Sequence, residues 1–326
     1  MVSLSIKEHR LVPFNIEAKE IMESYLAFID TEASDYTFAQ NYVWLSYSSG
    51  FYAIVKDTFC LFLLSGEELT MLLPPLGEKE KVNDALIECF AIMNEHNSSI
   101  YYSRIDYVCE FFLQGFVDYL EKGAEIFEIL ENFLVEKKYA DYIYLADDLI
   151  ELKGNVFHAK RNEINKFRKT YPNTSIEILD PQKHGEAIND LLNRWIANRM
   201  RYLPKDQTEQ FLDGISHERF AIRRILKRYT ELSLIGIVLK MGDDTVGFTV
   251  GERLNKTSAS VLIEKTDFEV LGSAQYIFRE FCKVLKAEYN CTYINVGDDM
   301  GFENLRKVKL SYRPYKLATK YAIYQK

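Results

Sequence analysis

The sequence predicts an α/β (α+β) protein of two tandem domains, each a mixed, mostly antiparallel sheet flanked by helices. Three observations support this fold class. The length of 326 residues exceeds an average domain and suits two. Hydrophobic residues make up 48% of the chain, enough for sizeable cores. Strand-like and helix-like hydrophobic patterns follow one another in a similar order in both halves.

The first half opens with a helical pattern over residues 17–29, and four short strand-like runs follow between residues 42 and 73. Apolar residues at helical spacing then predict a helix over 79–94. A short strand over 99–102 comes next, and we expect helices over 106–116 and 124–137.

The second half has the clearer pattern. A strand over 174–179 precedes helices over 185–200 and 217–229 and three strands over 232–241, 245–253 and 258–264. Gly242-Asp243-Asp244 predicts a hairpin between the first two of these three strands. A helix over 273–289, a strand over 291–296, a helical turn over 302–307 and two short strands over 310–312 and 318–324 complete the chain.

This order of elements is that of the GNAT acyltransferase fold, an analogy of topology that says little about chemistry. We therefore expect two tandem GNAT-like domains, an N-terminal one at 1–154 and a C-terminal one at 173–326, joined by a basic helix at 155–172.

We expect neither a signal peptide nor a membrane-spanning helix. The first 14 residues lack a signal-peptide pattern, and no run reaches the roughly 18 apolar residues of a spanning helix. Five scattered cysteines without a CxxC pair or a zinc-spaced histidine indicate structural thiols and no metal site. We expect a cytoplasmic protein without an integral membrane segment, and its oligomeric state does not follow from the sequence.

Charge is divided unevenly along the chain. Residues 1–154 hold 11 Lys and Arg against 27 Asp and Glu, a net charge of −16, whereas residues 155–326 hold 29 against 21, a net charge of +8. A polyanionic partner for the basic half would explain this division, and attraction between the two halves explains it equally well.

Two segments carry most of the candidate chemistry. The first is the predicted basic helix within 155–172, whose cations Lys160, Arg161 and Lys166 could meet phosphates; a solvated charged face is the alternative. The second runs from Arg306 to Lys320 and holds six cations and no acid. Read as a strand, it would direct Lys309 away from the core and into a cleft, unless it is an edge strand protected by lysines.

These segments resemble a known family. The patterns are Asp-Leu-Ile-Glu-Leu-Lys-Gly-x3-His-x-Lys-Arg-Asn-x-Ile-Asn-Lys-Phe at 148–167 and Gly-Phe-x-x-Leu-Arg-Lys-x-Lys-Leu-Ser-Tyr-x-Pro at 301–314. Both are similar to the DUF2156-like family of bacterial proteins that resembles the C-terminal catalytic domain of phosphatidylglycerol lysyltransferase. The run Asp35-Tyr36-Thr37-Phe38 also fits that family, so the resemblance covers nearly the whole chain.

The resemblance implies tandem GNAT-like domains that move an amino acid from aminoacyl-tRNA to a lipid hydroxyl or a peptide amine. The positions that match the family's two blocks are Lys160, Arg161, Asn162 and Asn165, then Asp299, Gly301, Leu305, Arg306, Lys309 and Pro314. One departure is Asn295-Val296-Gly297, where the family commonly has Asn-Arg-Glu. The membrane-spanning half of the lysyltransferases has no counterpart in this sequence, which weakens the case for a lipid acceptor.

Acetyl-CoA is disfavoured as donor. The stretch 265–274 has one glycine and two acids, Asp267 and Glu269, where acetyl-CoA enzymes hold a pyrophosphate on a Gly-rich loop. We expect no cofactor and take aminoacyl-tRNA as the candidate donor. The candidate acceptor is an amine or hydroxyl of a small molecule, a peptide or a lipid headgroup.

Three of these residues are candidates for catalysis. Lys309 would stabilise an oxyanion or a phosphate, and Glu264 or Asp299 would hold the aminoacyl ammonium or accept a proton. For each acid a surface or turn role is the alternative. The residues expected to bind the polyanion are Lys160, Arg161, Asn162, Asn165, Lys166, Arg306 and Arg313.

A second function class stays open. The same fold could serve as a non-catalytic RNA-binding, ligand-binding or regulatory protein, which the Val296-Gly297 departure favours slightly. A deep cleft lined by Lys309 and a carboxylate would favour the enzyme. A filled cleft would favour the binding protein.

Overall fold

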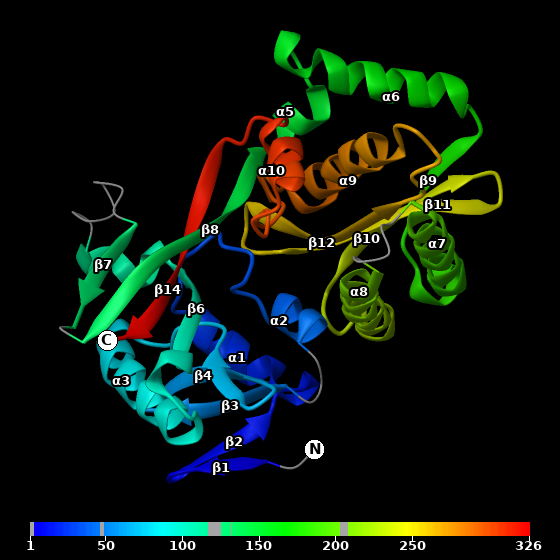
Figure 1. Ribbon diagram of the computed structural model, residues 1–326. Coiled ribbons are helices and arrows are strands. Elements are labelled where there is room, and N and C mark those ends of the chain that lie inside the picture. The colour runs from blue at the N-terminus through cyan, green and yellow to red at the C-terminus, as the bar shows by residue number, and fades with distance from the viewer. Residues whose placement is uncertain (1–2, 46–48, 117–124, 131, 203–207) are drawn as a thin grey trace. The chain divides into compact units, whose positions relative to one another are not determined.

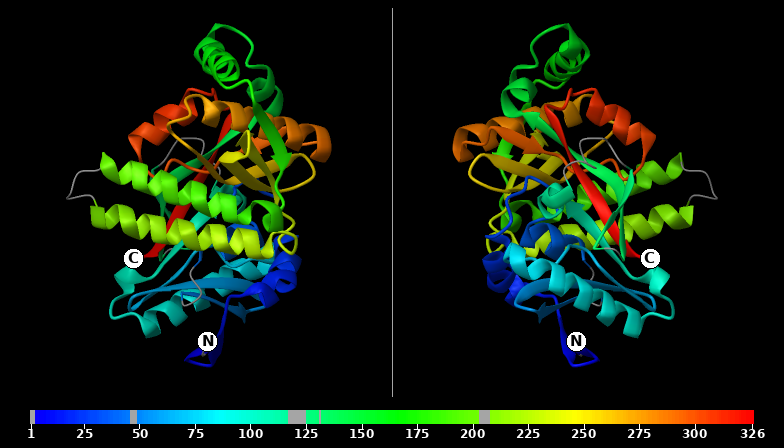
Figure 2. Two further views of the ribbon diagram at one scale, coloured as in Figure 1. Left: turned by 90° about the vertical axis from the view of Figure 1, so that its right-hand side faces the viewer. Right: turned by 90° about the vertical axis from the view of Figure 1, so that its left-hand side faces the viewer.

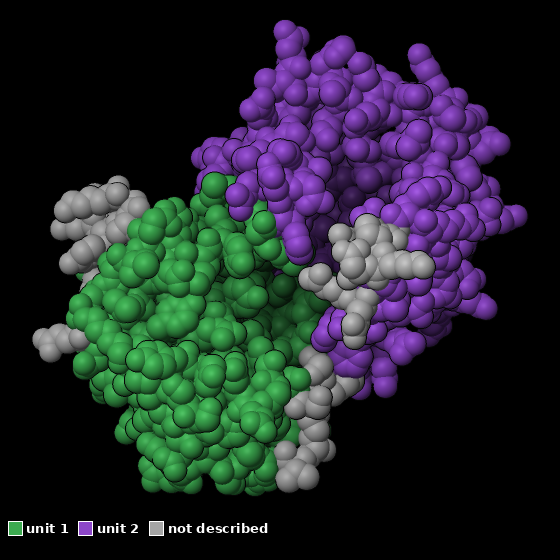
Figure 3. Space-filling model, viewed as in Figure 1, with its two compact units in different colours: residues 1–141, 298–301, 317–326 green, residues 142–297, 302–316 purple. Residues whose placement is uncertain are grey.

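The structure is a computed structural model that describes residues 3–45, 49–116, 125–130, 132–202 and 208–326. It divides into two compact units (Figure 3). Unit 1 comprises 1–141, 298–301 and 317–326, and unit 2 comprises 142–297 and 302–316. Each unit contains a mixed, mostly antiparallel sheet flanked by helices, which confirms the predicted fold class.

The compact units do not follow the predicted division at 154 and 173. Residues 155–172 belong to unit 2, and the last ten residues belong to unit 1. The cause is the last strand, which pairs with a strand of the first half in the register Lys320↔Cys109 and Ile323↔Ile105. Whether 1–154 and 173–326 fold as separate domains stays a prediction.

Unit 1 is built on strands that follow the order β1-β2-β3-β4-β5-β6-β14-β8, with β7 paired to β8 (Figure 1). Its strands are β1 (Leu4–Ile6), β2 (His9–Pro13), β3 (Gly50–Val55), β4 (Thr58–Ser65), β5 (Glu68–Met71), β6 (Arg104–Cys109), β7 (Ile126–Ile129), β8 (Phe133–Leu145, shared with unit 2) and β14 (Lys316–Gln325). Its helices are η1 (Ile16–Ala18), α1 (Lys19–Leu26), α2 (Phe38–Trp44), α3 (Lys79–His96), η2 (Ile100–Tyr102) and η3 (Glu110–Phe116).

The β3–β4 hairpin shows how the sequence builds this unit. Its two turn residues, Lys56 and Asp57, both have positive φ, as the tight turns that suit twisted strands require. Neighbouring residues of β4 face opposite sides of the sheet. Phe59 contacts the ring of Tyr25 on α1, whereas Cys60 contacts Cys89 on α3.

Unit 2 follows the strand order β8-β13-β12-β11-β10-β9. Its other strands are β9 (Thr174–Ile178), β10 (Ile235–Met241), β11 (Asp244–Arg253), β12 (Ser258–Thr266) and β13 (Tyr293–Asn295). Its helices are α5 (Ala146–Glu151), η4 (Asn155–Phe157), α6 (His158–Thr170), α7 (Pro181–Arg201), α8 (Thr208–Arg228), α9 (Ser273–Tyr289) and α10 (Glu303–Leu310). The hairpin predicted at 242–244 is present, with Met241 opposite Asp244.

Helices cover both faces of the unit 2 sheet. Helix α9 packs on β10, β11 and β12, and α5 and α6 pack in turn on α9 (Figure 1). Helices α7 and α8 run side by side against the other face, as both views of Figure 2 show. None of the described helices is both long and apolar enough to cross a membrane.

Several local predictions are wrong. Residues 42–44 belong to helix α2, and 100–102 form the 3-10 helix η2, where short strands were expected. Residues 106–116 form the end of β6 and a 3-10 helix, and 124–137 form β7 and the start of β8, apart from 124 and 131, which lie outside the described residues. In β7 only Phe127 and Ile129 face inward, which is the period of two typical of a strand. The helical turn expected over 302–307 is the start of helix α10, which continues to Leu310, although the alternation of Lys and apolar residues from 307 onward suggested a strand.

Candidate functional site

The candidate site in unit 2 lies along the part of β12 that continues past its parallel neighbour β13. The two strands pair only from Ser258↔Tyr293 to Ser260↔Asn295, and β12 runs on to Thr266. A shift of register against β11 near Val250 and Gly251 adds an irregularity to β12 at this point. Bulges of this kind redirect side chains and are frequent beside active sites.

Glu264 lies on this continuing part of β12, opposite Thr249 of β11. Its Oε2 atom is buried and has no hydrogen-bond partner in the structure. Desolvation by burial raises the pKa of its carboxyl to about 8. A buried carboxyl without a partner is unfavourable for stability, and groups with such shifted pKa values are frequent at functional sites.

Tyr312 adjoins this carboxyl and Tyr144 adjoins Tyr312, and neither was predicted as a site residue. Burial raises the pKa of Tyr312, and the neighbouring charges of Glu264 and Glu163 raise it further. The two tyrosine rings meet edge to face with centroids 6.3 Å apart. The Tyr144 hydroxyl donates to the Lys309 backbone oxygen at 2.8 Å. Only the aromatic richness of the chain pointed toward these rings.

Lys309 lies on helix α10, so the predicted strand position is corrected. Residues at helical spacing, Leu305, Lys309 and Tyr312, are the more buried ones of this segment, which explains why a helix forms. The Lys309 Nζ atom donates to the backbone oxygen of Val296 at 2.6 Å and of Gly297 at 3.0 Å. It thereby holds the backbone that follows β13. At these two positions the family commonly has Arg and Glu, and this chain has Val296 and Gly297.

Helix α6 contributes one of its predicted cations to this cluster. The Lys160 Nζ atom lies 4.5 Å from the centroid of the Tyr312 ring, a cation–π contact. Arg161 instead donates from Nη1 to the backbone oxygens of Leu152 and of Gly154, the latter at 2.7 Å. Arg161 therefore stabilises the turn before α6.

The remaining predicted residues lie outside this cluster. On α6, Asn162 is exposed and approaches the His158 ring at 3.4 Å, and Asn165 and Lys166 are exposed. Arg306 and Arg313 are exposed as well. Asp299 belongs to unit 1, where its Oδ1 atom accepts the Gly301 amide at 2.9 Å in a tight turn. The structure thus brings Lys160, Glu264 and Lys309 to one pair of tyrosines.

The first turn of α9 is covered by α6. Gly272, which precedes α9, has a φ of +86°, and a Cβ atom there would lie 2.9 Å from the Glu163 backbone oxygen and 3.0 Å from the Phe167 Cβ. The Phe167 ring also stacks on Tyr276 of α9 with centroids 4.7 Å apart. The helix N-terminus that could attract a phosphate is therefore in close contact with protein.

A buried charge cluster in unit 1 was missed by the sequence reasoning. Lys320, which is 2% exposed, lies 2.9 Å from carboxylate oxygens of Asp35 and Asp141 and 2.6 Å from one of Asp298. Burial lowers the pKa of Lys320, but the three carboxylates outweigh it and hold the pKa well above its ordinary value. Burial raises the pKa of Asp35 to about 6, against the opposing charge of Lys320.

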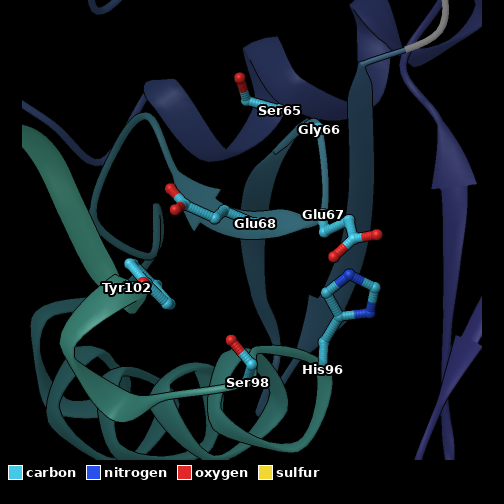
Figure 4. A pocket seen from close by; sticks show the side chains of 7 residues that line it. All are labelled: Ser65, Gly66, Glu67, Glu68, His96, Ser98 and Tyr102. Carbon is cyan, nitrogen blue, oxygen red and sulfur yellow. The ribbon is translucent and has the colours of Figure 1, made fainter.

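Unit 1 also carries an open cavity of about 530 Å³ beside the β4–β5 turn and the C-terminal end of α3 (Figure 4). Glu67 lies next to the His96 ring, and Glu68 and Tyr102 lie across the hollow from them. None of the residues predicted from the sequence lines this cavity. Within the described ranges no cluster of three or more His, Cys, Asp or Glu side chains is suited to hold a metal ion.

The family described as phosphatidylglycerol lysyltransferase, C-terminal, matches residues 26–324. The chain belongs to this family. The family is one of transferases, and its match confirms the resemblance seen in the two sequence blocks. Donor and acceptor are a separate question.

Solved structures of similar proteins share the fold. A conserved protein of unknown function from Bacteroides thetaiotaomicron is 27% identical, with 99% of this chain and 100% of that chain covered and a TM-score of 0.76. The C-terminal DUF2156 domain of a putative lysylphosphatidylglycerol synthetase from Agrobacterium fabrum is 13% identical over 96% and 93% of the chains, with a TM-score of 0.64. L-PGS from Bacillus licheniformis is 14% identical over 96% and 92%, with a TM-score of 0.61.

One curated relative matches part of the chain. An uncharacterised protein of Mycoplasmoides gallisepticum is 24% identical over 190 residues. The match spans 58% of this chain and 58% of that relative's length.

Proposed function

We propose that the chain transfers an aminoacyl group from aminoacyl-tRNA to an amine or hydroxyl acceptor at the cluster around β12 in unit 2. The observation that carries the proposal is the Glu264 carboxyl, whose buried Oε2 atom has no hydrogen-bond partner among the described residues and whose pKa is raised to about 8. A general base works best when its pKa lies near the working pH.

The reaction assigns one role to Glu264. The acceptor nitrogen or oxygen attacks the ester carbonyl, the bond from the carbonyl carbon to the tRNA ribose oxygen breaks, and the acceptor's proton passes to the Glu264 carboxylate. Glu264 then gives this proton to the ribose oxygen, which leaves as a hydroxyl, and the carboxylate is restored. Because the carboxyl is mostly protonated below pH 8, transfer should rise with pH until about pH 8.

Lys309 supports this step by its fixed position. Two backbone oxygens hold its ammonium at 2.6 and 3.0 Å, so the cation needs little reorganisation when negative charge develops on an oxyanion. Lys309 also positions the backbone at 296–297, and Tyr144 in turn holds the backbone of Lys309. Asp299 lies in a turn of unit 1, and we assign it no part in transfer.

Coenzyme A is disfavoured as donor for a steric reason. Helix α6 covers the first turn of α9 at Gly272, so a pyrophosphate could bind there only if α6 moved away. The acids Asp267 and Glu269 just before this turn would also repel a pyrophosphate. A tRNA does not need that position, because its phosphates could contact the exposed cations of α6, among them Lys166.

The acceptor is proposed only as a chemical class. An amine or hydroxyl of a small molecule, a peptide or a lipid headgroup fits the same chemistry. Phosphatidylglycerol, which the family description names, is one hydroxyl acceptor to include in the test.

A non-catalytic RNA-binding or ligand-binding protein is the second candidate. One observation favours it: the Lys309 ammonium is bonded to backbone oxygens of Val296 and Gly297. Such a contact would also arise if the lysine had a structural role alone.

The test uses total tRNA charged with labelled amino acids, offered with amines, short peptides and vesicles that contain phosphatidylglycerol. We expect label to move in a ribonuclease-sensitive reaction, and Glu264→Gln to slow it by about 100-fold or more. Glu288→Gln, at an exposed position on α9, is the matched control. Binding of tRNA without transfer to any acceptor would support the second candidate instead.

A further inference from the structure

Two buried cysteines of unit 1 lie in direct contact. The Cys60 Sγ atom on β4 and the Cys89 Sγ atom on α3 are 3.3 Å apart. Apolar side chains in a core usually approach to about 4 Å, so this pair is unusually close. The sequence separates the two residues by 29 positions, and no CxxC pattern announces them.

The core around the two sulfurs holds them in place. Cys60 pairs with Ala53 across the β3–β4 hairpin, and Cys89 lies in the middle of the 18-residue helix α3. Both residues are fully buried and belong to one hydrophobic cluster with Leu86 and Phe90. Because strand and helix are both fixed by packing, the sulfurs do not depend on flexible loops to meet.

The other three cysteines differ from this pair. Cys109, Cys282 and Cys291 are also free and buried, but none of them is in contact with another described cysteine; the Cys291 Sγ atom, for example, lies 3.7 Å from the Tyr289 backbone oxygen. Burial alone therefore does not distinguish Cys60 and Cys89. Their mutual contact does.

We propose that Cys60 and Cys89 form an oxidative modification site, at which a peroxide converts the two thiols into a disulfide that joins β4 to α3. In the first step one sulfur attacks the peroxide, a sulfur–oxygen bond forms, the oxygen–oxygen bond breaks and water leaves. In the second step the other sulfur attacks this sulfenic acid, the sulfur–sulfur bond forms and a second water leaves. Hydrogen peroxide supplies both oxygen atoms and accepts the two electrons.

Burial governs the rate of this reaction. Desolvation raises the pKa of the Cys89 thiol well above its ordinary value, and the neighbouring Cys60 raises it further. The thiolate is the reactive form, so the Cys89 sulfur stays reduced under weak oxidation. A peroxide is small enough to reach a buried sulfur through brief local openings, and the second sulfur then lies within reach of the sulfenic acid before it is oxidised further.

The test treats the folded, full-length chain with increasing hydrogen peroxide, denatures it in an excess of an alkylating agent, and maps the cysteine peptides by mass spectrometry. We expect one cross-linked peptide pair that contains Cys60 and Cys89, while Cys109, Cys282 and Cys291 are alkylated. Dithiothreitol should restore all five thiols.

Two variants sharpen the result. Cys60→Ser should abolish the cross-link, whereas the matched control Cys109→Ser, also buried in unit 1, should leave it intact. The proposal is overturned if Cys60 and Cys89 stay alkylatable while other cysteines oxidise, or if they become sulfinic acids without a disulfide. A cross-link that forms only above the unfolding transition overturns it too, because the folded contact would then play no part.

Discussion

Replacement of Glu264 by Gln should stabilise the protein and impair transfer at the same time. Glutamine has nearly the same size and keeps a polar end, but it cannot ionise. The wild-type carboxyl is buried at Oε2 without a hydrogen bond, so folding forces it toward its neutral form. Above pH 4.5 the wild-type carboxyl must therefore take up a proton when the chain folds, and the glutamine variant need not.

The magnitude follows from the pKa of Glu264, which is 4.5 in its ordinary state and about 8 in the folded chain. Because the folded form binds the proton more tightly, this group's favourable contribution is fully present below pH 4.5 and is lost as the pH rises toward 8. The loss is about 1.4 kcal/mol per pH unit, so wild type should be less stable than the variant by at most about 3 kcal/mol at pH 7.

Urea denaturation at pH 5, 7 and 8.5 would measure the gap between wild type and Glu264→Gln. We expect a gap below about 1 kcal/mol at pH 5 that widens toward pH 8. The exposed control Glu288→Gln should show no such trend. A gap that is independent of pH, or a variant less stable than wild type at pH 8.5, would refute the reasoning about the buried carboxyl.

Three further outcomes can be checked on the same preparations. Lys320→Met should destabilise the chain by about 3–5 kcal/mol in urea at pH 7, because it leaves three carboxylates without their buried cation; a loss below about 1 kcal/mol would contradict this. Gly272→Ala should lower the melting temperature, because φ is +86° and a Cβ would lie 2.9 Å from a backbone oxygen of α6, whereas Gly185→Ala in α7, with 3.8 Å of clearance, should not. Lys166→Glu should weaken tRNA binding and reduce the salt-dependence slope by about 1, whereas Lys227→Glu on the exposed side of α8 should leave both unchanged.

The fold class could be read from the sequence because unit 2 follows local rules. The turn at 242–244 and the amphipathic period of α9 each depend on neighbouring residues alone. Prediction failed where one segment fits both the period of a strand and the period of a helix. Alternation at 307–311 suits a strand, but Leu305, Lys309 and Tyr312 also fit a helix, and packing of their shared face decided the outcome.

The candidate site could be predicted only in part for the same reason. Lys309 was identified from its motif position and Glu264 was one of two candidate acids, but the contacts of Tyr144 and Tyr312 depend on segments that are distant in the sequence. Tyr144 reaches the backbone of Lys309 across 165 positions. Lys320 was counted only as one of the six cations between residues 306 and 320, because two of the three acids around it, Asp35 and Asp141, lie far away along the chain, Asp35 by 285 positions.

Because β14 belongs to unit 1, this unit cannot be completed until the end of the chain has been synthesised. A ribosome releases Asp35 and Asp141 early, but their counter-charge Lys320 follows roughly 180 residues after Asp141, on the order of 10 s later at typical elongation rates. Until then the nascent unit 1 also lacks the strand that pairs with β6. Folding of unit 1 during synthesis therefore depends on the last strand: Asp35, Asp141 and β6 gain their final neighbours only after β14 has been made.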